Sequence, residues 1–367
     1  MGLSVGIVGL PNVGKSTLFN ALLKKQQAYV ANFPFATIEP NIGVVPVPDN
    51  RLKRLSEVVK KSDNLSFFPP EVPATVEFLD IAGLIKGASK GEGLGNKFLS
   101  HIREVDAICH VVRSFSDPEI VKQGVEDPVS DLEVVETELE LADYETLEKQ
   151  KDPGNTPDKE LKKRFEVALK LKAALEKGIA AREVELSEEE RKIAKQLSLL
   201  TSKPILVVLN VDEEELKKAT EMETEYAVKM QLEKDQVIAI CAKTESELAG
   251  LSEDDQKEYL KESGIESPGL ERLIKKAFAT LGLITFLTAG EKEVRAWTIR
   301  CETRAQDAAG VIHTDFMKKF IKADVVDFES FITCEGWKNA REQGKVRSEG
   351  KDYIVKDGDV IEFKIGV

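Results

Sequence analysis

The sequence predicts an α/β protein built on a mostly parallel β-sheet, with a helical insertion and a smaller α+β domain at its C-terminal end. Three patterns support this prediction. Apolar strand-like runs alternate with helical segments over residues 1–129 and again over 203–282, residues 130–202 have helical periodicity, and residues 283–367 are rich in strand-like runs. Alternation of this kind is typical of a sheet covered by helices, with ligands at the carboxyl ends of its strands.

The alternating regions supply the strands and helices of the main sheet. A buried-type strand, Leu3–Val8, precedes a helix that starts near Ser16. The next elements are the strands Gly43–Val47, Thr75–Asp80 and Ala107–Val112 and a helix over Gly95–Arg103. After the insertion the pattern resumes with the strands Ile205–Leu209 and Val237–Cys241 and the helix Gly269–Leu281. These buried-type apolar runs favour parallel strands covered on both faces.

We interpret the insertion as a helical hairpin or a short coiled coil. Ser130–Glu133 has the spacing of a capping box and predicts the start of an acidic helix. Lys151–Pro157 interrupts this helix, a second helix follows over Asp158–Lys177, and Ser187–Glu190 predicts the cap of a third. A polar decoration without a partner is the alternative.

The C-terminal residues predict a separate α+β module. Strands are expected at Thr285–Leu287 and Arg295–Arg300, and a helix near Thr314–Ile321. Asp357-Gly358 is typical of a hairpin turn before a last strand, Val360–Ile365.

Composition narrows the class of protein. The chain has 367 residues, a formal net charge of −13 and four cysteines without metal-ligand spacing, which favours buried thiols in a reducing cytoplasm. Met1–Ser4 leads into the first strand without the basic region of a signal peptide, and no apolar stretch approaches the length of a membrane span. We therefore expect a cytoplasmic protein that binds neither membranes nor DNA, since its negative charge opposes general attraction to nucleic acid.

The most informative motif is Gly9–Ser16, which matches G-x-x-x-x-G-K-[ST], the loop that surrounds the phosphates of a nucleoside triphosphate. Gly9 and Gly14 leave room for inward-pointing N–H groups, Lys15 reaches the β- and γ-phosphates, and the Ser16 hydroxyl is a ligand for Mg²⁺. The predicted phosphate-binding residues are Asn12, Val13, Gly14, Lys15, Ser16 and Thr17.

A second motif supplies the rest of the magnesium site. Asp80 ends an apolar strand and Gly83 follows three residues later, so the carboxylate can hold the Mg²⁺ shell while the glycine N–H approaches the γ-phosphate. Between the two motifs, Thr37 offers a second hydroxyl to the ion on a loop that the γ-phosphate can order. We predict Lys15, Asp80 and Gly83 as the catalytic set, with Ser16, Thr37 and Asp80 as metal ligands.

The base is expected to bind at two later loops. Asn210-Val211-Asp212-Glu213 follows a strand where a guanine-specific protein carries N-K-x-D. Val211 replaces the lysine and Glu213 the aspartate, and the longer side chain displaces the carboxylate from a bidentate contact with guanine. Backbone groups and the Asn210 amide are left to bind adenine. The second base-contacting loop is predicted at Cys241, Ala242 and Lys243.

With these residues in place, the chain resembles the YchF-type, Obg-related P-loop GTPases, known in eukaryotes as Obg-like ATPases. The resemblance rests on Gly9–Ser16, Phe33–Asn41, Asp80–Gly83 and Gly87–Gly95, and it extends over essentially the whole chain. It implies a nucleotide domain interrupted by a coiled-coil insertion and a C-terminal TGS domain of the β-grasp type. It also implies Mg²⁺ dependence, ATP preferred over GTP, and association with the ribosome through the large subunit or its rRNA.

The sequence does not identify the group that positions the attacking water. Leu84 follows Gly83 where related switches carry a glutamine, and a leucine side chain cannot orient water. Relatives often have a histidine where this chain has Lys122. Catalysis is therefore expected to rest on Lys15, Mg²⁺ and loop N–H groups, with K⁺ near the carbonyl of Asn12 as a further hypothesis.

A locally basic segment is the candidate RNA-facing surface. Residues 338–351 have a net charge of +3 next to Trp337. The basic side chains are Lys338, Arg341, Lys345, Arg347 and Lys351. An ordinary solvated face is the alternative interpretation.

The leading interpretation is a slow, Mg²⁺-dependent ATP hydrolase that acts as a ribosome-associated switch in translation or stress response. A strict GTPase and a non-catalytic regulator that senses ATP are the alternatives.

Overall fold

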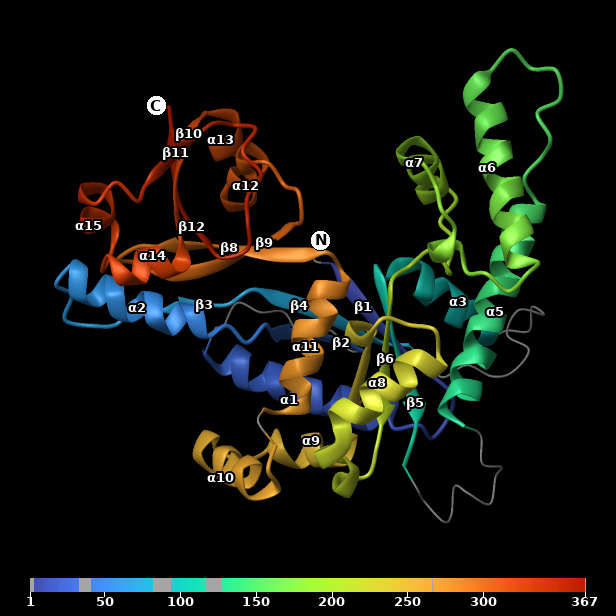
Figure 1. Ribbon diagram of the computed structural model, residues 1–367, viewed down its shortest axis with the longest axis horizontal. Coiled ribbons are helices and arrows are strands. Elements are labelled where there is room, and N and C mark those ends of the chain that lie inside the picture. The colour runs from blue at the N-terminus through green and yellow to red at the C-terminus, as the bar shows by residue number, and fades with distance from the viewer. Residues whose placement is uncertain (1–2, 33–40, 82–93, 116–126, 266, 367) are drawn as a thin grey trace. The chain divides into compact units, whose positions relative to one another are not determined.

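Two sheets organise the computed structural model, which describes residues 3–32, 41–81, 94–115, 127–265 and 267–366 (Figure 1). By their internal contacts the residues form two units. The first unit is Met1–Val45 with Glu77–Thr280, and the second is Pro46–Val76 with Leu281–Val367. Each unit has its own sheet and its own hydrophobic core.

The sheet of the first unit has the strand order β2-β4-β1-β5-β6-β7. Its strands are β1 (Ser4–Val8), β2 (Ile42–Pro46), β4 (Thr75–Asp80), β5 (Ala107–Arg113), β6 (Ile205–Asn210) and β7 (Val237–Ile240). β4, β1, β5, β6 and β7 are parallel neighbours. β1 and β6 are buried along their whole lengths, as expected for strands covered on both faces. The predicted parallel sheet is therefore confirmed.

Helices follow the strands of this sheet. Their bounds are α1 (Lys15–Asn32), α3 (Leu94–Glu104), α8 (Ala219–Lys229), α9 (Ala242–Leu248), α10 (Glu253–Ser263) and α11 (Gly269–Thr280), with short 3₁₀ turns at Glu213–Lys218 and Lys234–Gln236. α1 begins directly after the glycine-rich loop, with a backbone hydrogen bond of 3.0 Å from Leu18 N to Gly14 O in its first turn. This order places the N-terminus of α1 at the carboxyl end of β1.

The insertion lies between the neighbouring strands β5 and β6 and is helical, as predicted. It contains α5 (Pro128–Glu148), α6 (Lys159–Leu175) and α7 (Glu188–Gln196), which are the green helices in Figure 1. Ser187 and Glu190 form the predicted capping box of α7. The capping box predicted at Ser130 is wrong, because α5 already begins at Pro128 after the N-cap Asp127. Proline fits the first helical position, since its fixed φ suits the helix and it needs no hydrogen-bond acceptor there.

The second unit contains a sheet with the order β11-β10-β12-β8-β9-β3. The strands are β3 (Glu71–Val72), β8 (Leu283–Ala289), β9 (Val294–Arg300), β10 (Phe320–Asp327), β11 (Arg347–Glu349) and β12 (Asp359–Ile365). The helices are α2 (Asn50–Ser62), α12 (Ala305–Ile312), α13 (Thr314–Lys318), α14 (Phe328–Thr333) and α15 (Trp337–Glu342). Residues of α12 and of four of these strands form one core around Phe286.

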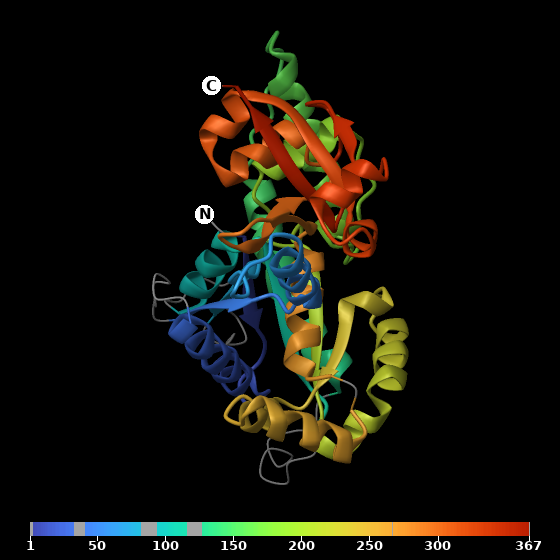
Figure 2. The ribbon, with the colours of Figure 1, turned by 90° about the vertical axis from the view of Figure 1, so that its left-hand side faces the viewer.

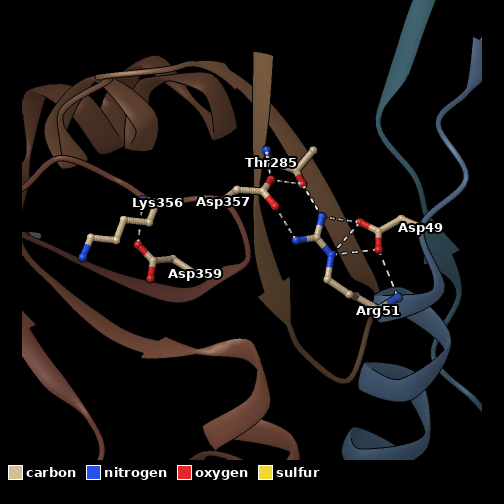
Figure 3. Close-up of polar contacts among 6 residues, drawn as sticks. All are labelled: Asp49, Arg51, Thr285, Lys356, Asp357 and Asp359. Carbon is tan, nitrogen blue, oxygen red and sulfur yellow. Dashed lines mark hydrogen bonds and ion pairs between the residues drawn. The ribbon is translucent and has the colours of Figure 1, made fainter. Parts of the chain in front are cut away.

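Residues 46–76 were assigned to the nucleotide-binding domain by sequence, but they pack with the C-terminal residues. Arg51 at the start of α2 binds Asp357 at 2.8 Å and the Thr285 hydroxyl at 2.7 Å (Figure 3). Asp49 holds the same guanidinium at 2.7 Å. Figure 2 shows α2 beside the strands of the C-terminal sheet. Periodicity reports local structure only, so it could not reveal a contact between residues about 300 positions apart in sequence.

The hairpin predicted at Asp357-Gly358 is wrong. Gly358 does turn the chain, with φ of 80°, but β12 pairs with β10 and β8, while β11 pairs with β10 on its other side. The last strand is therefore inserted into the middle of the sheet. Among the described residues, we find no helix with the length and apolar character needed to cross a membrane.

Candidate nucleotide site

The glycine-rich loop connects β1 to α1 and needs glycine at two positions. At Gly9, with φ of 150°, a Cβ atom would lie 2.3 Å from the carbonyl oxygen of Val111. At Gly14, with φ of 97°, a Cβ atom would lie 2.2 Å from the side-chain nitrogen of Asn210. Any larger residue would push the loop away from β5 or β6. The close approach explains why this segment carries glycine and places its N–H groups at the N-terminus of α1.

Lys15, at the start of α1, and Asp80, at the end of β4, lie near one another, as the pairing of β1 with β4 predicts. Asp80 is opposite Ile7 in the parallel pairing of β4 with β1, and the loop starts two residues after Ile7. Lys15 is 8% exposed, and its ammonium donates a hydrogen bond of 2.7 Å to the carbonyl of Leu10. Burial lowers the pKa of Lys15, and the charge of Asp80 partly opposes this shift. Burial likewise raises the pKa of Asp80, and the charge of Lys15 partly opposes it.

The side chains present fit a magnesium ion bound together with phosphates. The Ser16 hydroxyl is on an exposed residue of the first turn of α1, and the Asp80 carboxylate is half-buried at the end of β4. Both supply hard oxygen atoms, which Mg²⁺ prefers. Over the described residues, no group of three or more histidine, cysteine or carboxylate side chains is able to hold a metal ion. A site with one carboxylate and one hydroxyl suits Mg²⁺, which keeps water and phosphate oxygens as its other ligands.

Asn210 connects two loops of the site. Its amide nitrogen donates a hydrogen bond of 2.9 Å to the carbonyl of Val13, and its amide oxygen accepts one of 2.9 Å from the N–H of Ala242. Asn210 is 7% exposed, and Val13 and Ala242 are also buried. The phosphate loop and the start of α9 are therefore joined by one side chain at the end of β6. The sequence predicted that this amide contacts the base. In the structure, its nitrogen and its oxygen each hold one of the two loops.

The other predicted base-site residues differ in their surroundings. The Val211 side chain is 1% exposed in a core shared with Leu209 and Val112, so it packs inside the first unit. Glu213 is exposed and accepts a hydrogen bond from the hydroxyl of Tyr259, whose pKa is raised by burial and by this contact. Cys241 and Ala242 are buried and Lys243 is exposed at the start of α9. In the phosphate loop, Asn12 has φ of 63°, and Ser16 and Thr17 are exposed.

Several predicted residues lie outside the described residues. They are Thr37, Gly83, Leu84, Lys122 and most of the segment Gly87–Gly95. The assignment of these residues remains a prediction from sequence.

His110 was missed by sequence reasoning. It lies on β5, opposite Val8 of β1, and it is fully buried with no hydrogen-bond partner for either ring nitrogen in the described structure. Burial lowers its pKa to about 3, and the charges of Lys15 and Arg182 add to the shift. The sequence signal was a single polar residue inside the apolar run Ala107–Val112. A neutral imidazole therefore lies beside the strand that leads into the phosphate loop.

We expect His110 to make the protein sensitive to acid. Because the pKa of His110 is about 3 in the folded protein and its ordinary value is 6.5, the unfolded chain binds the extra proton and stability falls as pH drops from 6.5 towards 3. The loss from this residue is about 2 kcal/mol at pH 5. Urea unfolding of a His110→Leu variant at pH 8 and pH 5 should show a smaller loss than the unmodified chain. The matched His101→Leu variant changes an exposed histidine and should lose as much stability between pH 8 and pH 5 as the unmodified chain. An equal loss of unfolding free energy in all three proteins would contradict the assignment to His110.

The basic segment 338–351 belongs to the second unit and is partly neutralised. Arg341 binds Glu362, and Arg347 lies 3.5 Å from Asp359. Including these two carboxylates lowers the net charge of the surface from +3 to +1. The segment therefore offers less attraction to phosphate than its sequence indicated.

Comparison with known proteins agrees with this architecture. A family model described as a 50S ribosome-binding GTPase matches residues 4–153, and a model of the YchF GTPase C-terminal region, described as a protein of unknown function, matches residues 283–366. The chain is 51% identical to the ribosome-binding ATPase YchF of Bacillus subtilis and 49% identical to that of Escherichia coli O157:H7, with 100% of each chain covered.

A solved structure gives the same result for the fold. The YchF GTPase of Schizosaccharomyces pombe aligns with a TM-score of 0.86 and 37% sequence identity, covering 99% of this chain and 98% of that one. The likeness extends over both units, the helical insertion and the C-terminal region. The chain therefore belongs to the YchF family of Obg-related P-loop GTPases.

Proposed function

We propose that this protein is a Mg²⁺-dependent nucleoside triphosphate hydrolase that prefers ATP to GTP and acts as a ribosome-associated switch. The observation that carries the proposal is the junction at Asn210, which joins the phosphate loop at Val13 to the predicted base-contacting loop at Ala242. One nucleotide bound across this junction contacts both loops. The relatives' names, ribosome-binding ATPases, support the activity and the partner.

The phosphate end of the proposed site supplies charge stabilisation. Lys15 is buried, so its ammonium interacts more strongly with phosphate than a lysine in water does. On binding, we expect it to exchange the Leu10 carbonyl for phosphate oxygens. Ser16 and Asp80, with Thr37, would hold Mg²⁺, which neutralises charge on the phosphates. We extend the proposal to the Gly83 N–H at the γ-phosphate and to K⁺ near Asn12.

The preference for ATP is proposed to come from the position of Glu213. Tyr259 holds its carboxylate through a hydrogen bond, and the extra methylene moves this carboxylate away from the position that guanine requires. Val211 is buried and leaves no lysine stem over the base. Without these two contacts, guanine loses its advantage over adenine.

Single-turnover hydrolysis tests the proposal directly. With Mg²⁺ present, we expect ATP to bind and react with a specificity constant about tenfold above that of GTP, and we expect purified ribosomes to accelerate the reaction. Faster hydrolysis of GTP would favour a strict GTPase. ATP binding without acceleration by ribosomes would favour the ATP-sensing regulator instead.

A Glu213→Asp variant tests the base site. Shortening the side chain by one methylene should lower the ratio of ATP to GTP affinity by about tenfold, because the carboxylate regains the reach that suits guanine. Calorimetric titration with both nucleotides measures this ratio. The matched Glu214→Asp variant changes an exposed neighbour in the same way and should leave the ratio unchanged. An unchanged ratio in both variants would remove Glu213 from the proposed site.

A further inference from the structure

A cavity of about 620 Å³ lies in the second unit, and Trp337 and Arg341 of the basic segment are among the residues that line it. Four elements each contribute an aromatic ring to its lining: Trp297 from β9, Phe316 from α13, Trp337 from α15 and Phe363 from β12. The volume is within the range of ligand-binding sites, and sites of this kind are lined mainly by apolar groups. The cavity is therefore large enough for a long side chain and part of its backbone.

The ionised side chains around the cavity have a net negative charge. Glu291, Glu293 and Glu362 contribute three carboxylates, whereas Lys292 and Arg341 contribute two cations. Several of these groups are already paired, because Arg341 and Lys364 both bind Glu362, and Arg295 outside the lining binds Glu293. Within the lining itself, carboxylates outnumber cations by one, which favours a positively charged ligand over a phosphate group.

Both tryptophans of the lining already have an arginine guanidinium next to their rings. The Arg341 guanidinium lies 5.3 Å from the ring centre of Trp337, and that of Arg295 lies 4.5 Å from the ring centre of Trp297. Each of these arginines also pairs with a glutamate of the lining, Arg341 with Glu362 and Arg295 with Glu293. An aromatic face next to a carboxylate is the environment in which a guanidinium is stabilised by both cation–π and ionic attraction.

We propose that this cavity binds an arginine-containing basic segment of a partner protein. The inference rests on the proposed ribosome association and deepens it, since it assigns the contact of this unit to a basic protein segment rather than to RNA. Arg341 then occupies part of the site when the partner is absent. An incoming arginine takes the free space of the cavity and competes with Arg341 for Trp337 and Glu362.

Tryptophan fluorescence provides a direct test, because the chain contains two tryptophans and both line the cavity. The full-length protein is titrated with a short synthetic peptide of alternating arginine and glycine, and separately with single-stranded oligouridylate. We expect saturable quenching by the peptide and none by the oligonucleotide. The double variant Glu291→Lys, Glu293→Lys should bind the peptide about tenfold more weakly, whereas Glu258→Lys, an exposed charge reversal on α10, should not change its affinity.

The Arg341→Ala variant distinguishes a basic peptide from RNA as the ligand, because it should change the affinity for the two in opposite directions. Removing the competing guanidinium frees Trp337 and Glu362, so the peptide should bind about threefold more tightly. If RNA were the ligand, loss of a cation would instead weaken binding of the oligonucleotide. Absence of quenching by the peptide, or oligonucleotide binding that Arg341→Ala weakens, would overturn the proposal.

Cosedimentation with ribosomes separates this inference from the proposed function. If the unmodified protein fails to sediment with ribosomes, the proposed association is wrong, while the peptide titration still decides whether the cavity binds arginine. If the unmodified protein sediments and the Glu291→Lys, Glu293→Lys variant sediments equally well, the association stands and the role of the cavity in it is overturned.

Discussion

Replacement of Lys15 by alanine is expected to lower kcat/KM for ATP hydrolysis by about two to three orders of magnitude. The ammonium is the buried cation of the phosphate loop. In the proposed mechanism it stabilises the negative charge that develops on the γ-phosphate. Because Lys15 is the only buried lysine or arginine among the described residues, the loss of its charge should not be compensated. Steady-state measurement of phosphate release with Mg²⁺-ATP determines the effect.

Stability measurements separate this catalytic loss from unfolding. Burial already lowers the pKa of Lys15, which means that the folded chain bears a cost for keeping the ammonium charged. Thermal unfolding of Lys15→Ala without nucleotide should therefore occur at or above the temperature of the unmodified chain. Lys24→Ala, at an exposed position of the same helix, should retain normal turnover. Full turnover by Lys15→Ala would contradict the whole assignment of the phosphate site.

Replacement of Asn210 by alanine is expected to have the second-largest effect, on both stability and nucleotide affinity. The variant leaves the buried carbonyl of Val13 and the buried N–H of Ala242 without the partners that Asn210 provides. Each unsatisfied buried group costs about 1–3 kcal/mol, so the loss of two partners should lower the free energy of unfolding by about 2–6 kcal/mol. Urea unfolding measures this loss.

The same variant should bind ATP at least about tenfold more weakly, since the two loops are no longer held in one arrangement and binding must order them. Calorimetric titration at a temperature where the variant remains folded measures the affinity. Asn155→Ala, in the exposed turn before α6, provides a matched control that should leave both quantities unchanged. A stability change within about 0.5 kcal/mol would show that the Asn210 junction contributes little.

Local sequence was sufficient for the parts of the site that depend on short-range geometry. Gly9 and Gly14 are needed because a Cβ atom at either position would lie 2.2 to 2.3 Å from an atom of β6 or β5, and the motif specifies glycine at both positions. That Lys15 and Asp80 lie near one another was also predictable, because adjacent parallel strands deliver their carboxyl ends to one edge of a sheet. Both inferences use spacing and strand order alone.

The surroundings of His110, the partners of Asn210 and the pairing of the last strand depend on long-range packing, so local sequence did not predict them. His110 occupies a strand position that periodicity assigns to an apolar residue, and only the structure shows that neither ring nitrogen has a hydrogen-bond partner among the described residues. The Asn210 amide was assigned to the base from its motif alone. Its partners at positions 13 and 242 could not be foreseen, because they come close to it only in the folded chain. The last strand was assigned to a hairpin because turn residues do not specify which strand pairs with the next.

The sequence by itself determined the parallel sheet, the phosphate loop, the helical insertion and the family, because each depends on residue type at fixed local spacing. Only the tertiary structure decided that residues 46–76 pack with the C-terminal unit, that Asn210 joins two loops, and that both tryptophans line one cavity. The physical reason is the same in each case. These contacts join residues that are distant in sequence, and their energies depend on burial and on partners that the folded chain alone brings together.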